Sequence, residues 1–319
     1  MFGEACYDYM YKNLFYLNRF AKDKSIDFIL ELPVEIIGDD IISTLTKKYL
    51  EYKKLLCMFF REEFEYEDKQ DLLMKDLDVI QDSIINILSK NNHSDNESEA
   101  RLCRIIQKHH LFEKMKRPLN TNEVLYRFCN YSPSLCEDKD FYHCPFDKPT
   151  NGKRFCPAGK HHWFLGYSED VCKYETHEGE IGSMALLKSI DERELSVVDL
   201  TQDGLFEDNG SEIEYDCYIM WWLLACCYCY SPNRKDEENG AYIISQILSR
   251  YIEDTIPDII GIRYYTVRNV RLNPDERTYV NLALFTKKVN DEQYDMNLCG
   301  KFKVIKSFQN YSVNNINTL

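Results

Sequence analysis

Two arginines and one glutamate have the residue types that point most directly to chemistry. Arg154 and Glu175 lie on either side of a short apolar segment that begins at Trp163, and Arg127 lies upstream of both. Guanidinium groups hold phosphate oxygens through bidentate, charge-assisted hydrogen bonds. A carboxylate stabilises the positive charge that develops on a sugar when its glycosidic bond breaks. The three residues therefore indicate a site for an anionic nucleotide whose sugar is the reacting group.

The same stretch also has a purely structural interpretation. An arginine on a strand and a glutamate on the following helix form an ion pair more often than a catalytic site. Taken singly, Phe164, Trp163, Trp221 and Trp222 are more typical of a core than of a pocket wall. Residue types alone leave both interpretations open.

Length and charge limit the classes of function. A chain of 319 residues with 44% hydrophobic content is long enough to bury a large core, as one large or two medium domains. The net charge of -14 argues against a protein that coats nucleic acid, because neutralising phosphates needs a basic surface. Nucleic acid is therefore an unlikely partner, although a local basic pocket is compatible with this charge.

The elements needed to place the protein in a membrane or outside the cell are missing from the sequence. No apolar run reaches the length of a membrane-spanning helix, and the first fifteen residues carry Glu4 and Asp8 where a secretory signal has an apolar core. We expect a cytoplasmic protein without membrane association. Its thirteen cysteines are then expected to be mostly free thiols.

Two groups of cysteines are candidates for metal sites. Cys226 and Cys229 form a C-x-x-C pair inside the apolar run IMWWLLACCYCY, but no second pair at ligand spacing accompanies them. The second group has irregular spacings and comprises Cys136, Cys144, Cys156 and either His161 or His162. Loop residues that support a pocket explain this group better, so no metal is expected.

The first third of the chain has helical periodicity. Apolar residues recur at steps of three and four in two segments, Ile42 to Phe59 and Leu73 to Ile87. We expect an additional helix from Tyr7 to Phe20, a loop from Asn91 to Glu99, and a fourth helix that ends near Glu113. Arg117-Pro118 then ends the helical block.

After Pro118 the sequence changes to short strand-like runs and Gly/Pro punctuation. Helices are expected at about 168–178, 215–230 and 240–254, without a regular βαβ rhythm. The fold class is therefore α+β, with a helical domain at 1–117 and a second domain at 118–319. The expected strands are Val124–Phe128, Trp163–Leu165, Leu195–Leu200, Ile259–Thr266 and Val280–Phe285.

Eight short segments of the second domain resemble, in order, those of the RES domain family, in the variant that carries a helical N-terminal extension. Glu175 follows Phe164 by eleven residues within this pattern. The segments are VLYRF (124–128), FYHCPF (141–146), GKRFCPAG (152–159), WFLGYS (163–168), VVDLT (197–201), YIISQIL (242–248), GIRYYT (261–266) and VNLALF (280–285), which contains Asn281.

The resemblance implies an ADP-ribosyltransferase-like fold and an activity that splits NAD at the nicotinamide–ribose bond. NAD is then the substrate, and water or phosphate accepts the ADP-ribose. Members known as toxins deplete NAD, so a toxin or defence effector with a neutralising protein partner is implied in the same way, by analogy alone.

The resemblance also assigns roles to individual residues. Glu175 matches the family glutamate, which stabilises the ribose, and Arg127 and Arg154 match arginines expected at the pyrophosphate. Thr266 stands where the family has its serine and retains a hydroxyl. Asn281 matches the late asparagine, expected to bond the ribose or the nicotinamide amide.

Two residues depart from the family pattern. Phe164 stands where a tyrosine is common and Cys156 where this variant often has serine, so two hydroxyls are missing. An aromatic face for stacking on nicotinamide remains in Phe164. Tyr167 and Tyr126 are the candidates to supply a phenol instead. The changes predict a weaker activity or a changed acceptor.

Three alternatives stay open at this point. Arg104 with His109 and His110 resembles the Arg/His signature of HEPN ribonucleases, in which the arginine steadies a phosphate and the histidine moves a proton. Exposed helix residues explain the same pattern. A catalytically inactive interaction protein of the RES fold is the second alternative. The third is transfer of ADP-ribose to a macromolecule.

Overall fold

The computed structural model divides the chain into two compact units. Unit 1 comprises Met1–Met115 and Gln202–Tyr251, and unit 2 comprises Lys116–Thr201 and Ile252–Leu319. The mixed α+β class is confirmed, because helices accompany an eight-stranded mixed sheet. Only the backbone is described at 63, 68, 173–175 and 310–312. The described residues are 17, 19–24, 32–36, 40–63, 68–90, 96–119, 121, 123–130, 137–175, 181–191, 195–201, 215–230, 240–267 and 279–312.

The first domain boundary expected from sequence lies at 117, and the first change of unit lies at Met115/Lys116. The second part of unit 1, Gln202–Tyr251, comes from the segment that the sequence analysis assigned to the second domain. Helix α8 (Ile243–Thr255) begins within this second part of unit 1, and its residues from Ile252 onward are counted in unit 2.

Unit 1 is built on helices with one buried stripe each. The predicted stripes of α2 (Ile41–Glu63) and α3 (Asp68–Ser89) are confirmed, with Leu45, Tyr52, Leu77 and Ile84 fully buried. Further helices of this unit are α4 (Asn96–Lys108), α5 (Leu111–Lys114), α7 (Asp216–Cys227) and most of α8.

The loop predicted at Asn91 to Glu99 is wrong in its second half, because α4 already begins at Asn96. Glu97 and Glu99 lie in its first turn, where negative charge favours the helix dipole. Leu102 and Ile106 then bury its apolar side. Most of the helix predicted from Tyr7 to Phe20 lies outside the described residues, and the described Leu17, Arg19 and Phe20 are helical.

The centre of unit 1 is aromatic. Helix α7 is apolar all round and buried from Cys217 to Cys227, as expected for a core helix. Its Trp222 ring lies 5.2 Å from the ring of Tyr49 and 5.8 Å from that of Tyr52. The Tyr52 hydroxyl donates to the Tyr218 carbonyl at 3.0 Å. Two short parallel strands, β1 (Val34–Glu35) and β7 (Cys229–Tyr230), complete the described part of this unit.

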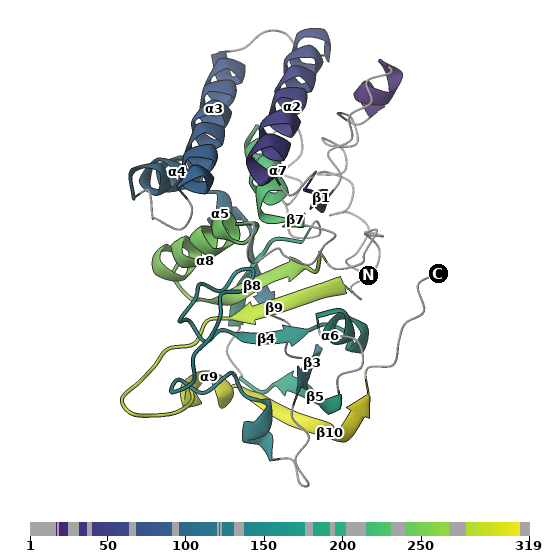
Figure 1. The fold of residues 1–319 in the computed structure, drawn as a ribbon, viewed down its shortest axis with the longest axis vertical. Helices are drawn as coiled ribbons and strands as arrows, with labels where there is room; N and C mark the ends of the chain where they lie inside the picture. Colours follow the sequence, from purple (N-terminus) through teal and green to yellow (C-terminus); the bar gives the residue numbers. More distant parts are fainter. Residues whose placement is uncertain are drawn as a thin grey trace. The chain divides into compact units, whose positions relative to one another are not determined.

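Unit 2 contains an eight-stranded sheet with the order β10-β5-β3-β4-β9-β8-β6-β2. Figure 1 labels the strands from β10 to β8 in this order. Strands β6 and β8 run parallel and the other neighbours are antiparallel. The strands are β2 (Lys116–Leu119), β3 (Val124–Cys129), β4 (Trp163–Gly166), β5 (Ile181–Ser189), β6 (Leu195–Asp199), β8 (Ile259–Tyr265), β9 (Val280–Leu284) and β10 (Phe302–Ser312).

The five predicted strands of the second domain are confirmed as β3, β4, β6, β8 and β9, and the helices expected near 168, 215 and 240 as α6 (Glu169–Glu175), α7 and α8. The helix expected at 215–230 is wrong at its end, because α7 stops at Cys227 and Cys229–Tyr230 form β7. Strands β2, β5 and β10 were not predicted. Two further short elements are the 3-10 helix Asp138–Phe141 and α9 (Met296–Cys299).

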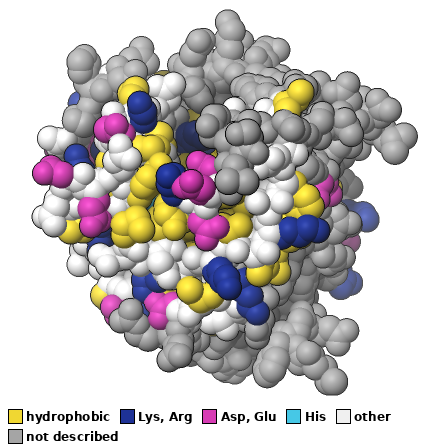
Figure 2. All heavy atoms as spheres, turned by 90° about the horizontal axis from the view of Figure 1, so that it is seen from below, with side chains coloured by type: hydrophobic (Ala, Val, Ile, Leu, Met, Phe, Trp, Pro, Cys, Tyr) yellow, Lys and Arg dark blue, Asp and Glu magenta, His cyan; other side chains and the backbone are white. Residues whose placement is uncertain are grey.

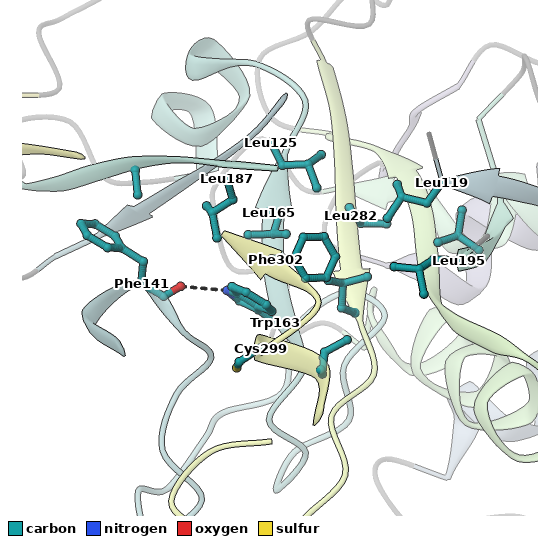
Figure 3. Close-up of a cluster of buried hydrophobic side chains, with 14 residues drawn as sticks. Leu119, Leu125, Phe141, Trp163, Leu165, Leu187, Leu195, Leu282, Cys299 and Phe302 are labelled. Carbon is teal, nitrogen blue, oxygen red and sulfur yellow. Dashed lines mark hydrogen bonds between the residues drawn. The ribbon is translucent and has the colours of Figure 1, made fainter. Parts of the chain in front are cut away.

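Each face of the sheet packs against a different set of side chains. One face carries the larger core, in which the Trp163 Nε1 donates to the Phe141 carbonyl at 2.9 Å (Figure 3). Leu125, Leu165 and Leu282 belong to this core, and we refer to it as the Leu165 face. The opposite face, the Phe164 face, packs on α6, and its apolar cluster is Phe128, Val171, Cys172 and Met184 with Tyr126 against it.

The surface mixes charges of both signs despite the acidic composition. On the face in Figure 2, hydrophobic side chains gather in a band that is interrupted by basic and acidic side chains. Among the described residues, no helix combines the length and the apolar composition that a membrane crossing requires.

Candidate functional site

Strand register brings several of the predicted site residues to the Phe164 face. Tyr126 of β3 pairs with Gly166 of β4, Gly166 pairs with Asn281 of β9, and Asn281 pairs with Tyr264 of β8. Directly paired residues project to the same face of a sheet. Tyr126, Asn281 and Tyr264 therefore form one row across four neighbouring strands.

Phe164 projects from the same face as this row and lies next to it along the strands. It is two residues before Gly166 in β4 and pairs with Ala283, which lies two residues after Asn281 in β9. The side chain of Phe164 is partly exposed. The ammonium group of Lys153 lies 5.2 Å from the centre of its ring, a cation–π distance. The aromatic surface on this face is thus next to a cation.

Helix α6 packs closely on the same face, because Gly166 leaves room for it. A Cβ at Gly166 would lie 2.3 Å from Val171 Cγ1 and 2.9 Å from Cys172 Sγ. The Cys172 thiol also donates to the Tyr126 carbonyl at 3.4 Å. Glu175 is the last residue of α6, so its backbone belongs to the element that covers this face. Its side chain lies outside the described part of the structure.

Arg154 lies in a tight turn whose ends are joined by two backbone hydrogen bonds. Lys153 N donates to Cys156 O at 2.8 Å and Cys156 N donates to Lys153 O at 3.0 Å. The Phe155 ring packs 4.8 Å from that of Tyr264, a member of the row. The turn is thereby anchored on the Phe164 face. Arg154 is 7% exposed and Lys153 is exposed.

Thr266 lies just beyond β8, where the pairing with β9 continues. Its backbone N donates to the Tyr279 carbonyl at 2.9 Å, and the residue is buried. Thr266 is two residues after Tyr264, so the alternation of the strand directs it toward the Phe164 face. The face accordingly gathers Tyr126, Phe164, Asn281 and Thr266, with the Lys153–Cys156 turn beside them.

The other two predicted residues belong to the opposite face. Arg127 follows Tyr126 in β3, and successive residues of a strand project to opposite faces. Its Nη1 donates to the Phe164 carbonyl at 3.0 Å, and its Nε is buried without a hydrogen-bond partner among the described residues. Tyr167 packs against the core of the Leu165 face and its hydroxyl accepts from Arg263 Nε at 2.9 Å.

Arg263 forms a partly buried charged cluster that sequence reasoning missed. Its Nη1 contacts Asp199 Oδ2 at 2.8 Å, its Nη2 contacts Glu123 Oε2 at 3.5 Å, and its guanidinium lies 4.9 Å from the Tyr167 ring. Burial lowers the pKa of Arg263, but Asp199 and the other partners outweigh burial and raise it overall. An arginine inside the otherwise uncharged segment GIRYYT was the available signal.

In the second candidate metal group, of cysteines and histidines, Cys136 lies outside the described residues. Cys144 and Cys156 are free thiols, as are Cys226 and Cys229. His161 and His162 bond backbone carbonyls through Nδ1, of Cys144 at 3.2 Å and of Phe155 at 2.9 Å. Within the described ranges, no group of three or more His, Cys, Asp or Glu side chains could hold a metal ion.

The Arg/His pattern in unit 1 is part of a network of charges. His109 lies between two carboxylates, with Nδ1 2.6 Å from Asp216 Oδ1 and Nε2 2.7 Å from Asp76 Oδ2. Both ring nitrogens contact carboxylates, which is typical of a structural histidine and not of one that transfers protons. Arg104 and His110 are exposed.

Comparisons of this chain with protein-family models, with curated proteins and with solved structures found no match.

Proposed function

We propose that the protein degrades NAD by cleaving its nicotinamide–ribose bond at the Phe164 face of unit 2. The observation that carries the proposal is the row of paired residues on this face, which includes Tyr126, Gly166 and Asn281. Phe164 lies beside the row, and α6 packs on the same face. An aromatic ring, an amide, a hydroxyl and two cations then surround one stretch of sheet. These groups suit a nicotinamide ring, a ribose and a pyrophosphate.

Each residue has a distinct role in the proposed reaction. Phe164 offers a ring face for nicotinamide, and Asn281 offers an amide to the ribose or the carboxamide. Lys153 and Arg154 attract the pyrophosphate. Thr266 supplies the hydroxyl that the resemblance to the RES family expects.

The proposed chemistry resembles glycoside hydrolysis. Nicotinamide leaves with the electron pair of the nitrogen–carbon bond, and positive charge develops on the ribose ring. Glu175 stabilises that charge with its carboxylate. The oxygen of water then bonds to the same ribose carbon and its proton passes to the solvent, or a phosphate oxyanion forms this bond without losing a proton. The products are nicotinamide and either ADP-ribose or its phosphate ester.

Arg127 and Tyr167 are excluded from the proposed pocket because strand alternation directs them to the Leu165 face. The Arg127 guanidinium instead donates a hydrogen bond to the backbone carbonyl of Phe164. The proposal includes an ADP-ribosyltransferase-like arrangement of the sheet. A role as a toxin or defence effector, with a neutralising protein partner, belongs to the same proposal and rests on the resemblance.

Chromatography of free nicotinamide tests the activity. Purified protein is incubated with NAD, with and without phosphate, beside the Glu175→Gln and Asp170→Asn variants. Both variants remove one carboxylate from α6, but Asp170 lies in the first turn of the helix. The expected result is release by wild type and Asp170→Asn, and a loss of about a hundredfold or more in Glu175→Gln.

Three outcomes separate the alternatives. No release by folded wild type under any condition sinks the proposal and favours an inactive interaction protein. Release coupled to labelling of a macromolecule identifies transfer in place of hydrolysis or phosphorolysis. RNA cleavage that is lost on His109→Ala and on His110→Ala substitution, in variants that remain folded, replaces the proposal with ribonuclease activity.

A further inference from the structure

The turn that carries Arg154 has an unfavourable backbone conformation. Phe155 has a φ of 56°, in the left-handed region that bulky side chains rarely adopt. Such a conformation persists only where the surroundings enforce it. Part of the enforcement is local, from the paired backbone bonds of Lys153 and Cys156. The rest comes from side chains outside the turn.

His162 is the side chain that holds the carbonyl of the strained residue. Its Nδ1 donates to the Phe155 carbonyl at 2.9 Å, and its side chain is 0% exposed. Its ring lies 5.0 Å from that of Phe285, which fixes the ring plane. The second ring nitrogen, Nε2, lies on the opposite side of the imidazole ring.

Glu253 lies on that other side. It belongs to the part of α8 counted in unit 2, and its Oε2 is 3.6 Å from His162 Nε2. The distance is an ion-pair contact that is too long for a hydrogen bond. The Lys160 ammonium lies 3.1 Å from the same Glu253 oxygen. The Glu253 side chain is 9% exposed, whereas that of Lys160 is 42% exposed.

We propose that His162 and Glu253 are positioning residues, which hold the Lys153–Cys156 turn so that Lys153 and Arg154 meet the pyrophosphate of the substrate. We call the pair His162 and Glu253, with the turn that it holds, the clamp. The proposal rests on the proposed function for its substrate, but the existence of the clamp does not depend on that function. Arg154 lies next to Phe155, so a change in the Phe155 backbone moves the guanidinium. Displacements of about 1 Å in a positioning group can reduce activity by up to about a hundredfold.

The charge state of His162 makes the clamp sensitive to pH. Burial alone would lower the pKa of His162, but Cys156 and Glu253 outweigh burial and raise the pKa to about 9. Burial would raise the pKa of Glu253, and His162 and Lys160 outweigh it in the other direction. The ion pair is therefore present at neutral pH and is lost as the pH rises through about 9. Substrate affinity is expected to fall over the same range.

Two variants separate the halves of the clamp. In His162→Asn, the amide can replace the Nδ1 donor to Phe155 but is neutral toward Glu253. In Glu253→Gln, the shape is kept and the negative charge is removed. Asp254→Asn is the matched control, because it removes one negative charge from an exposed position one residue further along the same helix.

The clamp is tested first without substrate, by amide hydrogen exchange of residues 150–160 at one fixed pH. Exchange is expected to be faster in Glu253→Gln than in Asp254→Asn, with the rest of unit 2 unchanged. Equal exchange in these two variants overturns the proposal, whatever the activity.

The consequence for substrate is tested by the KM and kcat of nicotinamide release between pH 6 and 10. We expect Glu253→Gln to raise KM by about tenfold or more with kcat within about twofold. The wild-type KM should rise on the alkaline side of this range, whereas the KM of His162→Asn should not change with pH. Faster exchange with a wild-type KM contradicts the positioning role. A wild type that releases no nicotinamide overturns the proposed function but leaves the exchange result to decide the clamp.

Discussion

Replacing His109 with alanine should destabilise unit 1 strongly. His109 makes two short contacts to carboxylates, at 2.6 Å and 2.7 Å, and its side chain is 17% exposed. A hydrogen bond to a charged group contributes about 1.5–3 kcal/mol. Asp76 and Asp216 keep Lys108 and Lys114 as partners, at 2.6 Å and 2.5 Å, so neither carboxylate is left alone.

The two bonds together contribute about 3–6 kcal/mol. Because neither carboxylate is left alone, the expected cost lies at or below the lower end of this range, at about 2–4 kcal/mol. With a denaturant slope of about 2 kcal/mol per molar urea, the midpoint of unfolding should fall by about 1–2 M. His110→Ala is the matched control, because the His110 side chain is 70% exposed and its charged contact with Glu113 spans 3.7 Å. This control should change the free energy of unfolding by less than about 0.5 kcal/mol.

The cost should also depend on pH in a defined direction. Hydrogen bonding to Asp216 raises the pKa of His109 above 6.5, with Asp76 adding to the rise and burial opposing it. A raised pKa in the folded state contributes stability that is complete below 6.5 and is lost as the pH rises through the folded value. The gap between wild type and His109→Ala should shrink on the alkaline side. A gap no larger than that of His110→Ala, or one that is constant across pH, refutes the reasoning.

Three further predictions concern unit 2. Gly166→Ala should cost about 1–3 kcal/mol of unfolding free energy, since its Cβ would lie 2.3 Å from Val171 Cγ1; a wild-type urea midpoint would contradict this. Burial lowers the pKa of His143, whose Nε2 accepts from Asp295 N at 2.8 Å, so its stabilisation is present above pH 6.5 and lost as the pH falls; His143→Gln should flatten this part of the stability profile. Arg263→Met should cost about 3–5 kcal/mol in thermal unfolding, because Asp199 is 2% exposed and loses its guanidinium, and adding Asp199→Asn should recover part of the loss.

Helices with a single apolar stripe were predictable from the sequence. The steps of three and four in Leu73 to Ile87 specify one buried side, and each residue of that stripe is buried in α3. Strand β5 has no such clear pattern, because it is buried on both sides over Gly182–Ala185. Strand β10 is an edge strand with two register shifts and an exposed middle, so its alternation is weak.

The division of the candidate site between two faces follows from strand alternation. Tyr126 and Arg127 are adjacent in β3, so a single pocket on one face cannot take both side chains from a regular strand. The partner of His162 was not predictable, because Glu253 is distant in sequence and only tertiary packing brings it near. The close approach of α6 to Gly166 also depends on packing that no local pattern encodes.

The rate of nicotinamide release from NAD by Phe164→Ala and Tyr167→Phe, measured beside wild type, tests most directly whether the reaction occurs at the Phe164 face. Circular dichroism and melting temperature establish that each variant is folded. The account predicts release by wild type, a decrease of about tenfold or more in Phe164→Ala, and a nearly unchanged rate in Tyr167→Phe. No release by wild type, or a loss confined to Tyr167→Phe, would contradict it.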